Sequence, residues 1–391
     1  MTAKPRILFT CGREGQYVRN LLVRRALQQR FDVLEVIDGH PGSLLLRNLR
    51  LVPRLLPALR SQPDLIFVGF YGHLLTLFLS RLTRAPILFD AYLSTWDTLC
   101  FDRQRFAPRS IAGRVAFALD RQAGLAARHT LLDTATHARF FAETFGIPEQ
   151  RLSAYYVGYD EQVFYPRPPA EPAGRFRVFF YGSFVPLQGV ETIVRAAKLL
   201  EAEPLQGIEF RIIGAGMDYS RVRRLAAELG VQRVDLLPPV PYAQLADEIA
   251  AATLCLGGPF GSSGKASRVI AGKTFQFLAM AKPTIVGDSP ANREAWTHGQ
   301  DVWMCRMADP EALAAAILEL KRDAGLRAHI AQRGYERCRE RFGPGSQAVH
   351  LEQIIVGLLA SRKAGPPASR EAGLLASREA GPPASREAGL L

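Results

Sequence analysis

Short β-rich segments alternate with helical segments along most of the chain, and this alternation starts again after residue 174. The β-rich segments of the first half are 6–10, 32–37, 64–70, 85–90 and 129–133, and those of the second half are 176–182, 208–214, 234–238, 253–258, 282–287 and 301–305. In the second half we expect the helices near 190–201, 218–229, 241–252, 273–281 and 310–320. Such alternation is typical of parallel sheets wrapped by helices. It predicts an α/β fold with two Rossmann-like, doubly wound domains in series.

A proline-rich stretch, YPRPPAEPAG at 165–174, separates the two halves with four prolines in ten residues. Proline and glycine at this density favour a linker. We therefore expect a first domain over 1–165, a linker over 166–174 and a second domain over 175–345. Ligands of doubly wound sheets bind outside the carboxyl ends of the strands. The cleft between the two domains is thus the expected site.

The C-terminal segment changes character after residue 358, where an eight-residue unit of the form ASREAGLL or ASREAGPP runs four times, once with Lys in place of Glu. The period is too short, and the Gly and Pro content too high, for stacked solenoid repeats. We expect a closing helix over 346–358 and a disordered, low-complexity tail over 359–391.

Cysteine usage and hydropathy favour a cytoplasmic location. The five cysteines are scattered and form no CxxC pair, which predicts a reducing compartment and argues against a disulfide framework or a zinc site. The longest uncharged run, 65–80, is shorter than the roughly 20 apolar residues of a membrane helix. No secretory signal precedes the first strand. We expect a soluble or membrane-peripheral protein, with 65–80 forming a buried strand and the start of a helix.

The net charge of +12 is unevenly placed in the first domain. Residues 1–60 hold eleven Lys and Arg against four Asp and Glu, whereas residues 61–165 hold ten of each. Nucleic acid, an anionic membrane or a phosphorylated acceptor could use this excess, but aromatic residues for base stacking are few here, so no nucleic acid is expected. Segment 44–60, rich in Leu and Arg, is either a broken amphipathic helix lying on anionic lipid or an ordinary helix with its leucines on the sheet.

The stretch GSSGKASRVIAGKTFQFLAMAKPTIVGD at 261–288 places Lys265, Arg268 and Lys273 just before an apolar helix, with no carboxylate between Ala251 and Gly287. The positive end of a helix dipole disfavours further positive charge. A bound diphosphate would offset both the dipole and the cations. Strand-glycine-helix junctions at Gly182 and at Gly214-x-Gly216 also suit a phosphate. A solvated basic loop and ordinary turn glycines remain the alternatives.

Several of these stretches together resemble the family 4-type (group 1) glycosyltransferases of the GT-B fold. In chain order, the stretches are VGYDEQVFYPRP, FFYGSFVPLQGVETIVRAAKLL, FRIIGAGM, VPYAQLADEIAAATLCL and FGSSGKASRVIAGKTFQFLAMAKPTIVGDS, and the resemblance covers roughly residues 5–345. The resemblance implies two Rossmann-like domains and transfer of a sugar from a nucleotide-sugar held mainly by the second domain. It also implies retention of configuration, with no cofactor and no bound metal.

The donor segment departs from the family pattern. Arg268 and Gln276 stand where many members carry two glutamates, the second of which usually grips the ribose, and Ser183 and Gln188 replace two cations that usually neutralise the diphosphate. We expect Lys265, Arg268 and Lys273 to replace that lost charge. The donor-binding candidates are Gly182, Gly214, Gly216, Lys265, Ser267, Arg268, Lys273 and Gln276.

The first domain supplies the acceptor-side and catalytic candidates. The loop TCGREGQ places Gly12, Arg13 and Gly15 after the first strand, where the resemblance implies contact with the acceptor. His73 and Asp90 follow strands at their carboxyl ends. A His there can bind a hydroxyl or take a proton, or be structural, and Asp90 could act as a base or stabilise an oxocarbenium ion. The catalytic candidates are therefore Asp90 and His73, with Asp97 as an alternative to Asp90, together with Lys273 of the second domain.

The sequence therefore predicts a glycosyltransferase that moves a hexose from a nucleotide diphosphate sugar to a glycan, lipid-linked or other acceptor hydroxyl. Peripheral contact with an anionic membrane at its inner face is a further expectation. Two alternatives remain open: a GT-B sugar-nucleotide 2-epimerase, and a non-catalytic basic binding module.

Overall fold

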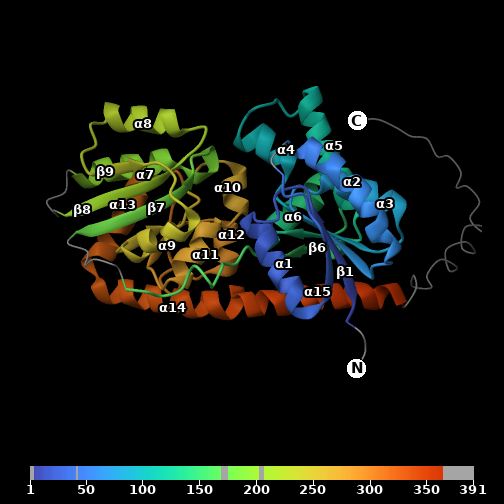
Figure 1. The fold of residues 1–391 in the computed structure, drawn as a ribbon. Coiled ribbons are helices and arrows are strands. Elements are labelled where there is room, and N and C mark those ends of the chain that lie inside the picture. Colours follow the sequence, from blue (N-terminus) through green and yellow to red (C-terminus); the bar gives the residue numbers. More distant parts are fainter. Residues whose placement is uncertain (1–3, 41–42, 169–174, 202–206, 364–391) are drawn as a thin grey trace, which may run out of the picture.

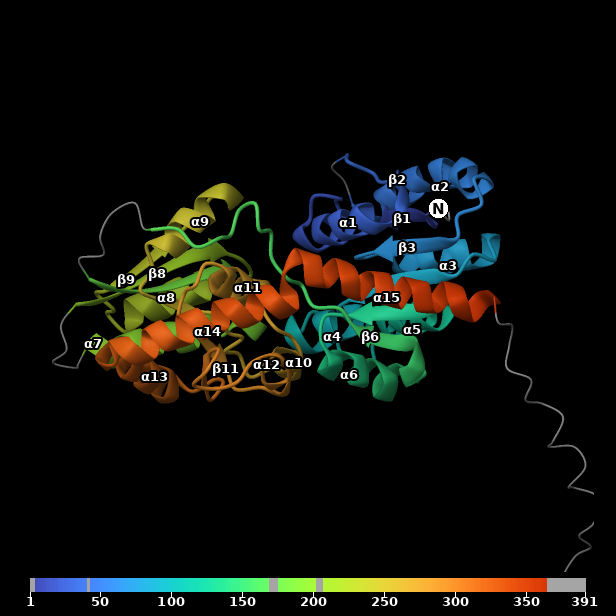
Figure 2. The ribbon, with the colours of Figure 1, turned by 90° about the horizontal axis from the view of Figure 1, so that it is seen from below.

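In the computed structural model, which describes residues 4–40, 43–168, 175–201 and 207–363, two sheet-based domains lie side by side (Figure 1). Helix α14 (Ala324–Phe342) runs along the second domain and α15 (Pro344–Lys363) along the first, as the view from below shows (Figure 2). The chain thus crosses between the domains twice: once after the first sheet, and once between α14 and α15.

The first domain is built on a six-stranded parallel sheet. Its order is β2 (Asp32–Val36), β1 (Arg6–Cys11), β3 (Leu65–Gly69), β4 (Ile87–Tyr92), β5 (His129–Leu132) and β6 (Leu152–Ala154). Strand β3 is buried along its whole length, as expected for a central parallel strand covered on both faces.

Helices cover both faces of this sheet. On one face, α1 (Val18–Arg30) and α15 bury Val23, Leu27, Leu351 and Ile355. The other face is covered by α2 (Leu44–Arg60), α3 (His73–Leu82), α5 (Ile111–Ala126) and α6 (Ala135–Phe145). The short α4 (Thr95–Asp97) and the π-helical turn η1 (Thr98–Asp102) follow β4, and the 3-10 turn η2 (Glu149–Arg151) precedes β6.

The second domain repeats this plan. Its sheet order is β12 (Trp303–Cys305), β11 (Thr284–Gly287), β10 (Leu254–Leu256), β7 (Phe176–Ser183), β8 (Ile208–Ala215) and β9 (Val234–Leu237). Helices α7 (Val190–Glu201), α8 (Tyr219–Glu228) and α13 (Pro310–Arg322) bury side chains on one face. The other face carries α9 (Tyr242–Ala250), α11 (Gly272–Ala279) and α14. The strand order reverses between β7 and β10, which is where ligands of such sheets bind.

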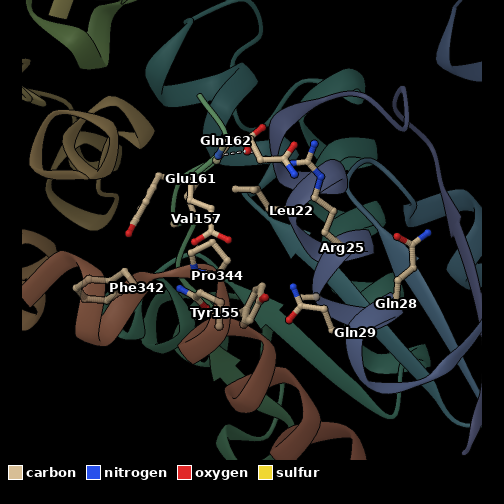
Figure 3. Close-up of a pocket in the computed structure, with 15 residues that line it drawn as sticks. Leu22, Arg25, Gln28, Gln29, Tyr155, Val157, Glu161, Gln162, Phe342 and Pro344 are labelled. Carbon is tan, nitrogen blue, oxygen red and sulfur yellow. Dashed lines mark hydrogen bonds and ion pairs between the residues drawn. The ribbon is translucent and has the colours of Figure 1, made fainter. Parts of the chain in front are cut away.

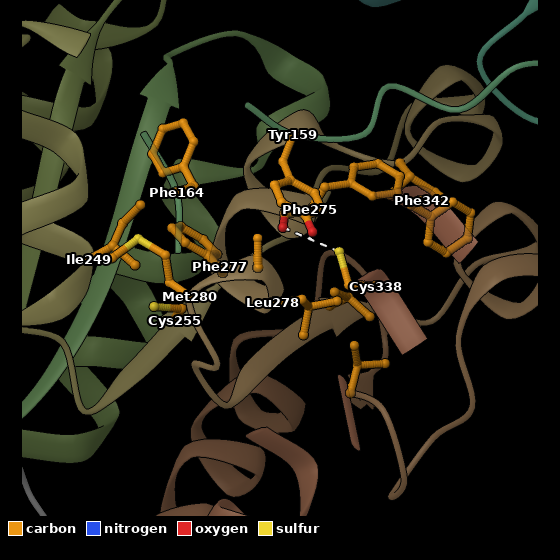
Figure 4. Packing of buried hydrophobic residues seen from close by; sticks show 14 of the residues in the cluster. Tyr159, Phe164, Ile249, Cys255, Phe275, Phe277, Leu278, Met280, Cys338 and Phe342 are labelled. Atoms are coloured by element: carbon orange, nitrogen blue, oxygen red, sulfur yellow. Dashed lines mark hydrogen bonds between the residues drawn. The ribbon is translucent and has the colours of Figure 1, made fainter. Parts of the chain in front are cut away.

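The core beneath α11 continues into the segment that links the domains. Tyr159 of that segment shares one buried cluster with Phe275 and Phe277 of α11 and with Phe342 at the end of α14 (Figure 4). Edge-to-face contact between Phe275 and Phe342, with ring centroids 5.2 Å apart, joins the two helices. Both chain crossings are thus anchored in the second domain's core.

Three helices lie at the domain interface, and each begins at an N-cap residue that has a hydroxyl side chain. These are α6, capped by Thr134, α10 (Gly264–Arg268), capped by Ser263, and α12 (Pro290–Ala295), capped by Ser289. Each cap oxygen accepts a hydrogen bond from a first-turn N–H that would otherwise lack a partner. A further 3-10 turn, η3 (Pro186–Gln188), follows β7.

The predicted α/β architecture of two doubly wound sheets is confirmed. The short strand β6 and helix α14 were not predicted. The expected closing helix over 346–358 lies inside the longer α15, which packs against α1 of the first domain. Linker residues 169–174 and tail residues 364–391 lie outside the described residues, so the predictions made for them remain predictions. Within the described ranges, no helix has the length and apolar character needed to cross a bilayer.

Candidate functional site

The two domains meet through α4, η1 and α6 of the first and α10, α12 and η3 of the second. These elements follow the carboxyl ends of β4 and β5 on one side and of β7, β10 and β11 on the other. The structure therefore brings the sequence-predicted donor segment against the first domain at the expected edge of both sheets.

Two of the three predicted donor cations already have partners from the first domain. Arg268 donates to both carboxylate oxygens of Asp97 at 2.8 Å. Lys265, only 4% exposed, donates to Oγ1 of Thr98 at 2.6 Å. Burial lowers the pKa of Lys265, and the carboxylate of Asp102 partly counteracts this. The expectation of a basic segment without partners is therefore wrong: the carboxylates come from residues distant in the sequence.

Lys273 has a different environment. It is 6% exposed in the first turn of α11, and its Nζ donates to Oε1 of Gln188 and lies 4.5 Å from the ring centroid of Phe180. In the described part of the chain no salt bridge includes Lys273. Burial lowers the pKa of this amine to about 7. A buried cation without a carboxylate is costly, and a bound anion would remove that cost.

Three predicted glycines line the same edge. A Cβ on Gly182 would lie 3.3 Å from Nζ of Lys273, and one on Gly214 would lie 2.0 Å from the carbonyl oxygen of Gly182. At Gly216 a Cβ would come within 2.4 Å of the carbonyl oxygen of Phe184. Gly214 and Gly216 require glycine because the ends of β7 and β8 pack backbone against backbone, whereas a side chain on Gly182 would crowd the amine of Lys273.

Ser267 and Gln276 differ in their burial and in their hydrogen bonds. Ser267 is half-buried, and its hydroxyl donates to the carbonyl oxygen of Gly264 at 2.7 Å, as a helix-surface Ser would. Gln276 follows Lys273 by three residues, is 5% exposed, and holds a buried Oε1 with no hydrogen-bond partner among the described residues. Of the two, Gln276 has the unsatisfied acceptor that a ligand hydroxyl could fill.

The predicted acceptor loop packs tightly against the end of β3. A Cβ on Gly12 would lie 2.0 Å from the carbonyl oxygen of Tyr71, and one on Gly15 would lie 3.1 Å from Ile37. Arg13 is 43% exposed, with Nε 2.9 Å from a carboxylate oxygen of Glu14. Its guanidinium lies over the rings of two tyrosines, at 5.3 Å for Tyr17 and 5.9 Å for Tyr71.

Aromatic residues gather at this edge of the first sheet, which the sequence did not single out. Phe70 lies at its centre, with centroid distances of 5.1 Å to Tyr17, 4.2 Å to Tyr71 and 4.9 Å to Tyr92. Tyr71 and Tyr92 both have left-handed backbone conformations, with φ of 59° and 61°. Such conformations are costly for bulky residues and are concentrated at functional sites.

His73 and Asp90 lie in closed environments. Nε2 of His73, 3% exposed, lies 3.1 Å from Oδ1 of Asp120. Asp90 is fully buried, and its two oxygens accept from Nε and Nη2 of Arg19 at 2.8 and 2.9 Å. Arg19 also donates to the carbonyl oxygens of Tyr155 and Tyr156. Through Arg19, Asp90 thus helps to hold the segment that follows β6 to the first domain.

Glu294 of α12 is an interface residue that sequence reasoning missed. Its carboxylate accepts from the N–H groups of Ala135 and Thr136 at 2.8 and 2.9 Å, and from the hydroxyls of Thr136 and Tyr156. The second domain thus supplies an anion to the N-terminus of α6, where the helix dipole favours it. No local sequence signal marks a cap that comes from another domain.

A cavity of about 470 Å³ opens beside this interface. It is lined by Asp102, Arg103, Gln104, Val185, Pro186, Gly189, Val190, Glu191, Thr192, Met217, Asp218, Arg221, Val222, Gly261, Ser262 and Ala308. Both domains contribute to its walls, and its charged groups have both signs. In the described part of the chain, no three His, Cys, Asp or Glu side chains are grouped as metal ligands.

A sequence model of the family described as Glycosyl transferases group 1 matches residues 175–323. The second domain is therefore similar in sequence to this family. Residues 175–323 contain the edge of β7 and β8, Lys273 and the interface helices α10 and α12, so the group 1 match covers the whole predicted donor side.

Two curated relatives have names that describe them as glycosyltransferases. D-inositol 3-phosphate glycosyltransferase of Thermobispora bispora is 28% identical over 58% of this chain and 55% of its own length. Lipopolysaccharide core biosynthesis glycosyltransferase LpsD of Rhizobium meliloti is 28% identical over 44% of this chain and 46% of its own. This chain therefore spans about half the length of the curated relatives it matches.

Solved structures extend the likeness to both domains. Anabaena Alr3699/HepE, solved in complex with UDP, superposes with a TM-score of 0.67 at 16% identity, over 90% of this chain and 100% of that one. Sucrose-phosphate synthase from Thermosynechococcus elongatus gives 0.71 at 15% identity, over 92% and 100%. At this identity the likeness shows the fold. Together with the group 1 match, it confirms the predicted resemblance to GT-B glycosyltransferases.

Proposed function

We propose that the protein transfers a hexosyl group from a nucleoside diphosphate sugar to a hydroxyl of a glycan or lipid-linked acceptor. The observation that carries this proposal is Lys273, a buried amine without a carboxylate partner among the described residues, at the point where the order of the second sheet reverses. A diphosphate would supply the missing negative charge, and the N–H groups at the start of α11 would add to its binding.

The reaction needs one bond made and one broken at the anomeric carbon. The acceptor oxygen attacks that carbon, the bond to the diphosphate breaks, and the electron pair leaves on the diphosphate oxygen. With attack on the same face, that oxygen can take the acceptor proton, which gives retention without a protein base or a metal. Lys273 stabilises the leaving group. Asp90 and His73 receive no proton-transfer role, because their contacts are internal.

We infer the classes of donor and acceptor from the side chains of the site and from the names of similar proteins. Structures of HepE hold UDP, and in one case UDP-glucose, which makes uridine nucleotides the first donors to test here. The relatives' names specify an inositol phosphate and a lipopolysaccharide core. For this chain we assign the acceptor to the edge formed by Gly12, Arg13 and Tyr71, where a stacked guanidinium favours an anionic group.

Peripheral membrane contact at the inner face is part of the proposal, and helix α2 supports it. Despite Pro53 and Pro57, 44–60 forms one helix that buries Leu51 and Leu55 on the sheet. Its outer face still presents Leu46, Leu49 and Leu56, exposed by 50, 59 and 46%. Arg54, which donates to the carbonyl oxygen of Ile37, and Arg50, which is paired with Asp38, stand beside these leucines on the exposed side. Leucines flanked by arginines suit an anionic bilayer surface.

Donor binding is tested with Lys273→Gln, and Lys198→Gln, an exposed lysine on α7, serves as the control. We expect UDP to raise the melting temperature of the wild type and of Lys198→Gln, and titration calorimetry to show at least about tenfold weaker UDP binding by Lys273→Gln. GDP, ADP and CMP are compared in the same way. Undiminished binding by Lys273→Gln would contradict the donor assignment.

Turnover is tested by mass spectrometry of UDP-glucose incubations, with and without glycan acceptors. A glycosylated acceptor supports transfer. An epimerised nucleotide sugar formed without acceptor would favour the 2-epimerase, and salt-sensitive binding of nucleic acid without any turnover would favour a binding module.

Membrane contact is measured by co-sedimentation with anionic and neutral vesicles, and Leu49→Glu should lower binding to the anionic ones.

A further inference from the structure

We propose that a cavity at the hinge between the domains binds a small, neutral, hydroxyl-bearing ligand of the monosaccharide class, at a site separate from the donor edge. The cavity has a volume of about 370 Å³ (Figure 3). Its lining comes from α1, from residues 155–162 and from the passage between α14 and α15. Its size is near the lower end for ligand pockets, which run from roughly 300 to 1,000 Å³.

Amide side chains dominate the polar lining. Four glutamines contribute: Gln28, Gln29, Gln162 and Gln347. An amide both donates and accepts hydrogen bonds, as a sugar hydroxyl does. Gln347 is only 7% exposed, and its Oε1 is buried without a hydrogen-bond partner among the described residues. Because a buried oxygen left unpaired is unfavourable, a hydroxyl donor in the cavity would stabilise this arrangement.

The charged side chains that line the cavity disfavour the binding of an anion. Nη1 of Arg25 donates to Oδ1 of Asp160 at 2.8 Å, so these two charges offset each other. Glu161 is then the remaining charged group of the wall. Leu22 and Pro344, both half-buried, add apolar surface (Figure 3), against which the C–H face of a sugar ring can pack. A neutral sugar fits this combination better than a sugar phosphate.

The cavity touches both segments that connect the domains. Residues 155–162 lead out of the first sheet, and Phe342 and Pro344 flank the passage from α14 to α15. These crossings are in close contact, because a Cβ on Gly158 would lie 3.0 Å from the carbonyl oxygen of Phe342. A ligand that contacts both crossings shifts the domain arrangement if it binds one arrangement more tightly than another.

Binding is tested by saturation-transfer NMR titration with methyl α-D-glucopyranoside as the neutral probe and glucose 6-phosphate as the anionic one. We expect the wild type to bind the neutral probe more tightly. Gln347→Leu should weaken that binding roughly fivefold. Gln332→Leu, on the exposed surface of α14, should leave it unchanged. Gln29→Leu provides a second lining variant, and melting curves confirm that each variant is folded.

The outcomes separate this proposal from the transferase proposal, since no nucleotide is present. Equal binding by wild type and both lining variants would overturn it, as would failure of both probes to bind, which would leave a water-filled cavity. Tighter binding of the phosphate would overturn the neutral class. Small-angle scattering tests the coupling: the probe should change the radius of gyration of the wild type but not of Gln347→Leu, and an unchanged radius in both would refute it.

Discussion

Arg268 and Asp97 form an ion pair across the domain interface, in which one guanidinium nitrogen lies 2.8 Å from each carboxylate oxygen. The guanidinium carbon also lies 4.1 Å from the ring centroid of Phe140, and the main-chain oxygen of Arg268 accepts a hydrogen bond from Thr134. A side chain expected to bind the donor diphosphate is thus held by three residues of the first domain. These contacts join the donor segment to that domain.

This pair predicts a measurable coupling energy. Asp97 is 2% and Arg268 18% exposed at the side chain, so solvent screens the pair only in part. We expect Asp97→Asn to lower the free energy of unfolding by about 2–3 kcal/mol. In a double-mutant cycle with Arg268→Met, the coupling should be at least about 1 kcal/mol by chemical denaturation. Additive effects of the two substitutions would show that the contact contributes nothing.

Donor binding should depend on pH through Lys273. Burial lowers the pKa of this amine from 10.5 to about 7, so about half of the free protein carries the charge at pH 7. A bound diphosphate favours the charged form and raises the pKa again. Binding therefore takes up a proton above pH 7, and UDP affinity should fall by up to about tenfold per pH unit as pH rises beyond that value.

Calorimetry in two buffers of different ionisation enthalpy measures this proton uptake directly. Lys273→Gln should bind UDP weakly and without the pH dependence, whereas Lys198→Gln should follow the wild type. A flat affinity profile between pH 7 and 9 in the wild type would mean that Lys273 does not meet the diphosphate.

The alternation of strand and helix signals was enough to predict both sheets, because central strands such as β3 and β11 are buried along their length and read as apolar runs. Helix α14 was missed for a physical reason. Its buried positions are Ile330, Gly334, Cys338 and Phe342, a narrow stripe in which two members are weakly hydrophobic. Strand β6 has only three residues, too few to show a period.

The site was predicted in part. The donor segment and the glycines beside Lys273 were found because turn chemistry and clustered charge are local signals. The first-domain partners of Lys265 and Arg268 were not found from the sequence. Asp97, for example, lies 171 residues from Arg268. The linear pattern contains no information on which carboxylate faces which cation. Contacts between domains, such as those of Glu294, require the folded arrangement.

Asp90 was predicted as a catalytic group, and its contacts with Arg19 predict a different result. Both side chains are at most 1% exposed, so Asp90→Asn leaves a buried guanidinium without its counter-charge. We expect a loss of about 3–5 kcal/mol in the free energy of unfolding, with kcat per folded molecule largely unchanged. Asp235→Asn, on exposed β9 surface, is the control. A large fall in kcat at unchanged stability would restore the catalytic assignment.

Glu294 should contribute to the joining of the domains through the N-terminus of α6. Glu294→Ala removes the acceptor of two N–H groups and two hydroxyls, so the free energy of unfolding should fall by about 2 kcal/mol. Glu294→Gln keeps one acceptor oxygen but loses the charge that the helix dipole favours, and a smaller loss is expected.

Glu228→Gln, on the exposed end of α8, controls for a general effect of removing a carboxylate and should leave stability unchanged. Hydrogen exchange locates the effect, because the amides of Ala135 and Thr136 should exchange faster in Glu294→Ala than in Glu228→Gln. If those amides kept their protection while stability fell, the loss would arise within the second domain. Glu294 would then support α12 and not the interface.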